Sequence, residues 1–219
     1  MKVLSTLALK GVLDRMRAEA ERAAGPLELR FDATQAILAD VKAGARPDVV
    51  IVTEEAMNTW RAEGFVTQAR ELGTSGVGVA VRAGAPKPDI SSVDALTRSL
   101  VAAKSVARSK VGASGLYFVE VLQKLGIADR LQKLIIVEKG PVGRVVAAGE
   151  AEIGVQQLCE LAPVPGIDIV GPFPDAVQRL TSFWAGIPAS SSDARAAAAL
   201  MDFLASAEAR SAMQQGGFN

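Results

Sequence analysis

The sequence contains no histidine and a single cysteine, Cys159. Without histidine the chain has no Ser-His or Cys-His catalytic pair and no histidine-bound zinc, and one cysteine cannot form a disulfide within the chain. These absences exclude most familiar hydrolase chemistry, and we expect neither a cofactor nor a bound metal. Cys159 lies in the run IGVQQLCEL and is interpreted as a small core residue.

The chain also lacks a surplus of charge of either sign and lacks long apolar runs. Its 24 basic and 24 acidic residues cancel, and no Lys/Arg cluster is longer than a pair, so nothing indicates binding to nucleic acid or to an anionic membrane. No segment approaches the roughly 18 apolar residues of a membrane span. We therefore expect a small-molecule partner, with no nucleic acid and no membrane insertion.

The N-terminal stretch MKVLSTLALKGVL superficially resembles a secretion signal, but Lys10 interrupts its apolar run and Arg15 and Arg17 follow closely. We interpret this stretch as a strand followed by a helix. The expected location is periplasmic if an export signal has been removed, and cytoplasmic otherwise.

What the sequence does contain is an alternation of strands and helices. The apolar patterns predict a strand at 2–5, a helix at 7–24, a strand at 27–31, a helix at 34–43 and a strand at 47–52. This βαβαβ order is typical of a parallel, doubly wound sheet. The pattern begins again after Ser91, which indicates a second lobe.

With 219 residues, the chain is long enough for two lobes of about 100 residues each. The predicted fold class is α/β, with two doubly wound parallel-sheet lobes joined by a two-strand hinge. Lobe one is predicted to comprise 1–78 and 184–219, lobe two 79–183, and the hinges to lie near 76–82 and 172–184.

Two Gly- or hydroxyl-containing loops lead from a predicted strand into a helix. In the first, Gly112 and Gly115 let the backbone approach a ligand closely, and Ser114 is placed to cap the helix. In the second, Thr34 follows the strand LELRF and precedes a helix. Because helix N-termini present free N–H groups, each loop is a candidate anion socket, and two sockets on two lobes suggest a cleft.

The ordered set of motifs resembles the type II periplasmic solute-binding proteins, specifically the molybdate-binding-protein-like family of ABC transporter receptors. The likeness covers nearly the whole chain. It is carried by the opening strand with Ser5-Thr6 and by six further segments: FDATQ, GARPDVVIVTEE, GASGLYFVEVLQKLGI, GPVGRVVAAGEAEIGVQQ, GIDIVGPFP and MDFLASAEARSAM.

The resemblance implies a small oxyanion held between the lobes by hydroxyl groups and main-chain N–H donors. It matches Ser5 and Thr34 to hydroxyl ligands, the 111–114 region to the small-residue loop of lobe two, and Val142 to a main-chain donor. Gln156 or Gln157 replaces the family's characteristic tyrosine. The full set of predicted ligand-binding residues is Ser5, Thr6, Thr34, Arg108, Ser109, Gly112, Ser114, Gly115, Val142, Gln156 and Gln157.

Arg108 ends a predicted central strand and should emerge at the edge where open α/β sheets bind ligands. A guanidinium suits the planar fork of a carboxylate, whereas a tetrahedral dianion needs a small neutral cage of donors. Plainer interpretations stay open: Ser5, Thr6 and Thr34 as helix caps only, and Arg108 as a solvated surface residue.

Two functions follow from these observations. The leading hypothesis is a solute-binding protein that closes two lobes over a small organic carboxylate for ABC-type transport or sensing, with an ABC permease as a possible partner. The alternative is a metal-free isomerase of a small di- or tricarboxylate such as aconitate, since some relatives of the resembled family are thought to act in this way. The catalytic residues of such an enzyme are left unknown.

Overall fold

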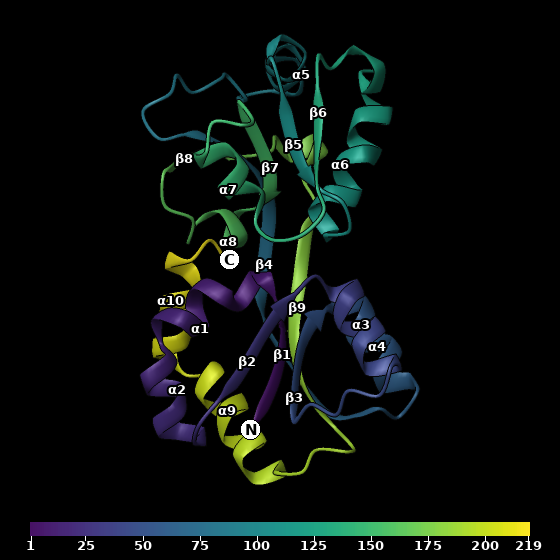
Figure 1. Ribbon diagram of the computed structural model, residues 1–219, viewed down its shortest axis with the longest axis vertical. Coiled ribbons are helices and arrows are strands. Elements are labelled where there is room, and N and C mark those ends of the chain that lie inside the picture. Colours follow the sequence, from purple (N-terminus) through teal and green to yellow (C-terminus); the bar gives the residue numbers. More distant parts are fainter. The chain divides into compact units, whose positions relative to one another are not determined.

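The computed structural model describes residues 1–219 and divides into two compact units (Figure 1). Unit 1 comprises Met1–Thr74 and Thr181–Asn219, and unit 2 comprises Ser75–Leu180. Strand β4 (Val66–Arg82) runs through the first division, and strand β9 (Leu180–Pro188) starts at the second. The predicted boundaries, after residues 78 and 183, lie a few residues C-terminal to these observed divisions.

The sheet of unit 1 is parallel at one side and antiparallel at the other. Strands β1 (Lys2–Thr6), β2 (Glu28–Asp32) and β3 (Val49–Thr53) run parallel, β9 pairs antiparallel with β3, and the order is β2-β1-β3-β9-β4. The central strand β3 has the sequence VVIVT and is buried on both faces, as expected for a parallel strand covered by helices on both sides.

Helices cover both faces of this sheet (Figure 1). On one face, α3 (Thr34–Lys42) and α4 (Glu54–Ala62) pack Ile37, Met57 and Trp60 against Val50 and Val52. The helices on the other face come from both ends of the chain: α1 (Lys10–Arg15), α2 (Arg17–Ala24), α9 (Ala194–Leu204) and α10 (Ala207–Gln215). The C-terminal helices thus pack on the N-terminal ones, with α9 against α2 and α10 against α1.

The single helix predicted over 7–24 is instead three pieces, which corrects that part of the prediction. A 3₁₀ turn, η1 (Leu7–Leu9), precedes α1, and the backbone of Met16 leaves the helical region with φ −104° and ψ 21°. Met16 is buried, so its apolar side chain fits the helical periodicity although its backbone interrupts the helix.

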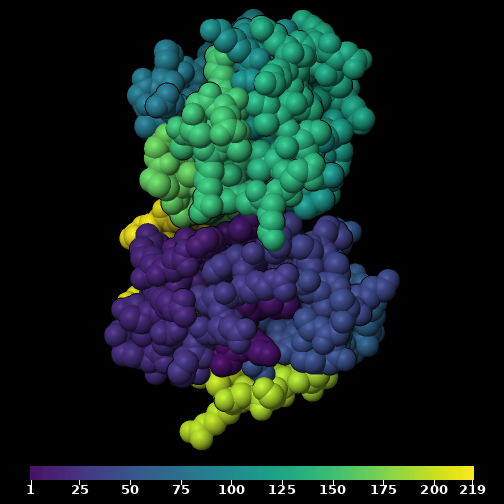
Figure 2. All heavy atoms as spheres, in the orientation of Figure 1, coloured from purple at the N-terminus to yellow at the C-terminus, as the bar shows by residue number.

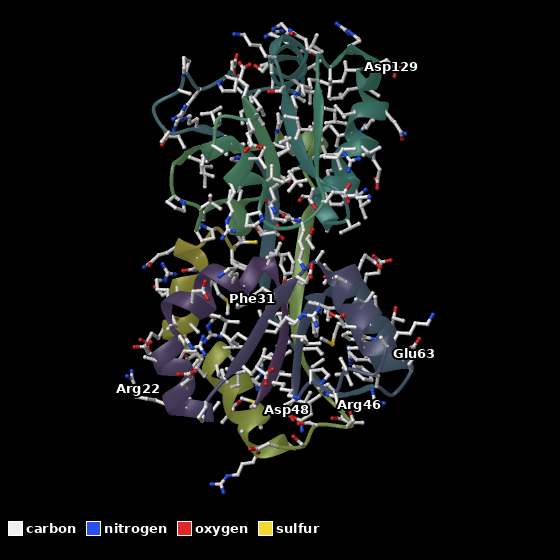
Figure 3. All side chains as sticks on the ribbon, viewed as in Figure 1. Arg22, Phe31, Arg46, Asp48, Glu63 and Asp129 are labelled. Carbon is white, nitrogen blue, oxygen red and sulfur yellow. The ribbon has the colours of Figure 1, made fainter.

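Asp48 stabilises, through hydrogen bonds, the end of the unit 1 sheet where the parallel strands begin. Its carboxylate accepts hydrogen bonds from the backbone N–H groups of Lys2 and Ser192, both at 2.8 Å, and from the Ser192 hydroxyl at 2.8 Å. Figure 3 shows Asp48 at the opposite end of the sheet from Phe31, near the end of β2. The edge at Phe31 is therefore the carboxyl edge of the parallel strands.

Unit 2 repeats the plan with its own sheet. Strands β5 (Val106–Ser109), β6 (Leu134–Val137) and β7 (Ile153–Gln157) are parallel, in the order β4-β7-β5-β6. Strand β4 pairs antiparallel with β7 and with β8 (Ile167–Pro172).

The two faces of this sheet have separate cores, because successive side chains of a strand point to opposite faces. Val106 belongs to the core under α5 (Val93–Ala102) and α6 (Ala113–Lys124), with Leu100 and Phe118. Ala107 belongs to the core under α7 (Val142–Ala147), with Val146. The remaining short elements are η2 (Ala128–Arg130), α8 (Leu158–Leu161) and η3 (Asp175–Val177). Figure 2 shows the closely packed surface of each unit.

Strand β4 extends well before the hinge predicted near 76–82, because it begins at Val66. Its first half carries exposed polar residues, among them Thr67 and Glu71, so the alternation that marks a strand is weak there. None of the helices has the length and apolar character needed to cross a bilayer.

Gly115 allows α6 to start directly on the end of β5, and we expect Gly115→Ala to destabilise unit 2. A Cβ at this position would lie 2.0 Å from the Ser109 backbone oxygen, so the helix would have to move. Overpacking of this kind costs about 1–3 kcal/mol or more, which chemical denaturation measures. The control is Gln123→Ala on an exposed position of the same helix. Equal stability of the two variants would contradict the inferred close approach.

Candidate functional site

Ser5 and Thr6 end strand β1 at the carboxyl edge of the unit 1 sheet. Thr6 lies beside Asp32 in the parallel register, and Ser5 lies beside Phe31. Both hydroxyl residues are buried. The Ser5 hydroxyl donates to the Thr6 carbonyl oxygen at 3.0 Å, whereas the Thr6 Oγ1 atom is buried without a hydrogen-bond partner.

Thr34 is the first residue of α3, with Ala33 as its N-cap and no side-chain cap. The carbonyl oxygen of Ala33 accepts from the N–H groups of Ala36 and Ile37, while no acceptor in the chain faces the N–H groups of Thr34 and Gln35. Thr6 does occupy the N-cap position of η1, but no side-chain capping bond forms there. The N-cap of α3 is Ala33 rather than Thr34, and the Ser5 hydroxyl donates to a carbonyl oxygen instead of accepting from a helix N–H.

In unit 2 the Ser109 side chain stabilises the loop after β5 through a hydrogen bond. The Gly112 N–H donates to Ser109 Oγ at 2.9 Å, and α6 begins at Ala113 with Gly112 as N-cap. Ser114 lies buried inside the first turn and is therefore not the cap that the sequence indicated. The N–H groups of Ala113, Ser114 and Gly115 have no acceptor in the chain, so this turn presents donors.

Arg108 lies one residue before the end of β5, between Ile136 of β6 and Val155 of β7. Its Nη1 atom donates to the Ser109 carbonyl oxygen at 2.9 Å, with a longer contact of 3.5 Å to that of Gly115. Its Nε atom is buried and has no acceptor. A buried donor on a charged group is costly to leave unpaired, so the guanidinium has the property expected of a group that receives an oxyanion.

Gln156 and Gln157 end β7 next to β5, and each is 1% exposed. The Val142 N–H donates to Gln156 Oε1 at 2.7 Å, so two predicted ligand contacts are bonded to each other. Gln157 lies opposite Val77 on β4.

The structure thus brings the predicted residues together in two groups, one at the carboxyl edge of each parallel sheet. Ser5, Thr6 and Thr34 form the group of unit 1, and the other eight form that of unit 2. Seven polar residues are buried in the chain, and five of them are predicted site residues: Ser5, Thr6, Ser114, Gln156 and Gln157. A buried polar group is costly unless it has a hydrogen-bond partner, so such groups are few in a folded chain. Their concentration at the two carboxyl edges distinguishes these edges from the rest of the fold.

Glu160 is a residue of this region that the sequence did not single out. It lies in α8, directly after β7, and its carboxylate accepts a hydrogen bond from Gln156 Nε2. Burial raises the pKa of Glu160 from its usual 4.5 to about 7, although the hydrogen bond from Gln156 acts in the opposite direction. The sequence holds a weak signal for it, since Glu160 follows the Gln-Gln pair by one short helical turn.

Comparison with known proteins gives a match over the whole chain. The family model of the bacterial extracellular solute-binding proteins matches residues 1–219. An aconitate isomerase from a Pseudomonas species is 38% identical over 227 residues, which cover 99% of this chain and 86% of that relative.

Among solved structures, the periplasmic molybdate-binding protein of Azotobacter vinelandii gives a TM-score of 0.82 at 19% identity, covering 100% of this chain and 98% of that one. The L-phospholactate-bound form of PEB3, a protein from Campylobacter jejuni, gives 0.71 at 12% identity, covering 100% and 99%. At these identities the likeness concerns the fold, and it confirms the predicted type II periplasmic binding protein fold.

The raised pKa of Glu160 predicts an unusual pH dependence of stability. Between pH 4.5 and about 7 the folded state holds a proton on Glu160 that the unfolded state has lost, so the free energy of unfolding should fall as the pH rises through this window. We expect a loss of about 1–3 kcal/mol from this group. Glu160→Gln should remove it, and Glu150→Gln, at an exposed position of the same unit, should not. Denaturation at pH 5 and pH 8 measures the difference, and an equal slope in the two variants would contradict the assignment.

Proposed function

This chain belongs to the bacterial extracellular solute-binding proteins, and we propose that its ligand is a small organic carboxylate. The function in this proposal is the capture of that solute for ABC-type transport or sensing, with an ABC permease as the partner in the transport case. The predicted likeness to the molybdate-binding branch is confirmed at the level of family and fold.

The observation that carries the proposal is the Arg108 guanidinium, whose buried Nε has no acceptor in the chain. A carboxylate matches a guanidinium with two parallel hydrogen bonds, and such charge-assisted bonds are the strong ones. The free N–H groups that begin α6 lie on the same loop and add positive potential without adding net charge.

The class of carboxylate is suggested by the 38% identical relative, whose name states that it acts on aconitate. Aconitate carries three carboxylates, which suits a site made of several separate donor groups better than one compact cage. We therefore propose the di- and tricarboxylates as the first class to test, with molybdate as the tetrahedral comparison.

Replacing Arg108 by alanine should weaken binding of trans-aconitate, the probe ligand, by about 10- to 100-fold, because one charge-assisted interaction of about 1.5–3 kcal/mol is lost. Isothermal titration calorimetry of wild type and variant measures this change, and molybdate is titrated in parallel.

The matched control is Arg130→Ala, which removes an exposed arginine from the same unit. Thr6→Val, in unit 1, reports whether that hydroxyl contributes to the same binding event. An unchanged affinity for trans-aconitate in Arg108→Ala would show that the carboxylate is held elsewhere, and wild type that binds molybdate more tightly than any carboxylate would reject the proposed ligand class.

Isomerisation of the bound carboxylate is a second candidate function, favoured by the name of the 38% identical relative and by Glu160. Proton carriers work best when their pKa lies near the operating pH, and burial places the pKa of Glu160 at about 7. In a chain without histidine, the Glu160 carboxyl is our candidate for the acid–base group near neutral pH that histidine usually supplies.

If the chain is an isomerase, wild type incubated with cis-aconitate should produce trans-aconitate, which proton NMR resolves directly. In D₂O a route through proton transfer should also place deuterium on carbon in the product. Arg108→Ala should lower the rate, whereas Arg130→Ala should not. Tight binding of both isomers without interconversion would assign the chain to binding alone.

A further inference from the structure

Three groups of unit 2 form a continuous hydrogen-bonded chain that joins a helix start to a carboxyl group. The Val142 N–H, at the first residue of α7, donates to Gln156 Oε1 at 2.7 Å. The other end of the same amide, Nε2, donates to the Glu160 carboxylate. Val142 and Gln156 are both buried, so water does not substitute freely for either bond.

The amide of Gln156 has a direction, because one end accepts hydrogen bonds and the other donates. The Val142 N–H requires an acceptor, so Oε1 faces α7 and Nε2 faces α8. An ionised carboxylate accepts only, and its bond to an amide N–H is charge-assisted. A protonated carboxyl is a weaker acceptor and also carries a donor of its own, which competes for the amide oxygen.

No basic side chain holds the Glu160 carboxylate in its charged form. The elements packed against α8 are β7, α7 and β8, together with β4, whose Ser75 hydroxyl accepts from the Cys159 N–H at 3.1 Å. The ionisable residues of β4 do not pair with Glu160: Arg70 pairs with Asp202, Glu71 accepts from the Ser182 hydroxyl, and Arg82 is exposed. Strand β7 carries no ionisable side chain. Helix α7 carries Arg144, which is exposed and forms no salt bridge with Glu160, and β8 carries Asp168, which accepts from the Gly84 N–H at 2.9 Å.

Within α8 itself, burial raises the pKa of the Cys159 thiol far above its usual range, so that neighbour stays neutral. Burial likewise raises the pKa of Glu160 to about 7. The carboxyl is therefore the group in this chain of bonds whose charge changes near neutral pH.

We propose that Glu160 is a positioning residue that controls, through the Gln156 amide, whether the Val142 N–H is available to an anionic ligand. While Glu160 is ionised, it holds the amide with Oε1 over the Val142 N–H. When Glu160 is protonated, the charge-assisted bond is lost, the amide is free to turn, and the N–H is released. The ligand in this inference is the carboxylate of the proposed function, on which this part rests.

The sign of the effect follows from the charges. Protonation of Glu160 releases a donor and removes a negative charge near the ligand, and both changes favour an anion. Binding should therefore be tight below pH 7 and weaken above it. If the bound state requires the neutral acid, affinity at pH 8 should be about tenfold lower than at pH 6.

The first experiment uses ligand-free protein, so it does not depend on the proposed function. In ¹⁵N–¹H spectra recorded from pH 5 to 9, the Val142 backbone and Gln156 side-chain amide resonances should shift together with one midpoint near pH 7. Glu160→Gln should abolish the common midpoint, and Glu150→Gln, at an exposed glutamate of the same unit, should leave it. Resonances that do not shift together, or that shift with the same midpoint in Glu160→Gln, overturn the inference.

The second experiment measures trans-aconitate affinity at pH 6 and pH 8. Wild type and Glu150→Gln should lose affinity about tenfold, and Glu160→Gln should show little change. Gln156→Met keeps Glu160 but removes the amide, so the part of the pH effect carried by the amide should disappear. A full pH effect in Gln156→Met overturns the role of the amide. Absence of trans-aconitate binding at both pH values rejects the proposed ligand. The ligand-free titration still decides whether protonation of Glu160 is coupled to Gln156 and Val142.

Discussion

The close contact between the end of strand β5 and the start of helix α6 determines the chemistry of unit 2. A side chain at Gly115 would lie 2.0 Å from the Ser109 backbone oxygen, and one at Gly112 would lie 2.8 Å from Ser109 Oγ. Glycine at both positions brings the first turn of a 12-residue helix onto the strand end where Arg108 emerges. Positive charge from the arginine and from the helix N–H groups is thereby concentrated at one place.

The fold could be predicted from the sequence to a large extent, because each parallel strand is a short apolar run between helix and loop signals. The strand VVIVT and the repeated strand-helix alternation required no tertiary information. What periodicity could not show was local backbone geometry. The interruption at Met16 and the start of α6 at Ala113 depend on dihedral angles of single residues, and apolar spacing is insensitive to these.

The same limit applies to the candidate site. Loop position and residue type were enough to nominate Arg108 and Gln156, since both stand where parallel strands end. They could not show that Val142 and Gln156 would bond to each other, because that contact joins two elements 14 residues apart along the chain. Glu160 was missed for a related reason: its raised pKa arises from desolvation in the folded chain, and the sequence LCEL does not show how far its one glutamate is withdrawn from solvent.

Two ionisable groups of unit 2 differ in how their charge responds to pH. Arg108 contributes a fixed positive charge with a buried, unfilled donor, and the nearby Lys110 is already paired with Glu138 at 2.8 Å on the surface. Glu160 contributes a charge that depends on pH near neutrality. A compact dianion with no proton to exchange would interact with the first group and gain nothing from the second. A polycarboxylate is different, because its several carboxylates have pKa values of their own and it can bind with a proton shared between ligand and protein. We therefore propose organic acids rather than metal oxyanions as the ligand class, because unit 2 holds both a permanent cation, Arg108, and a titratable carboxyl, Glu160.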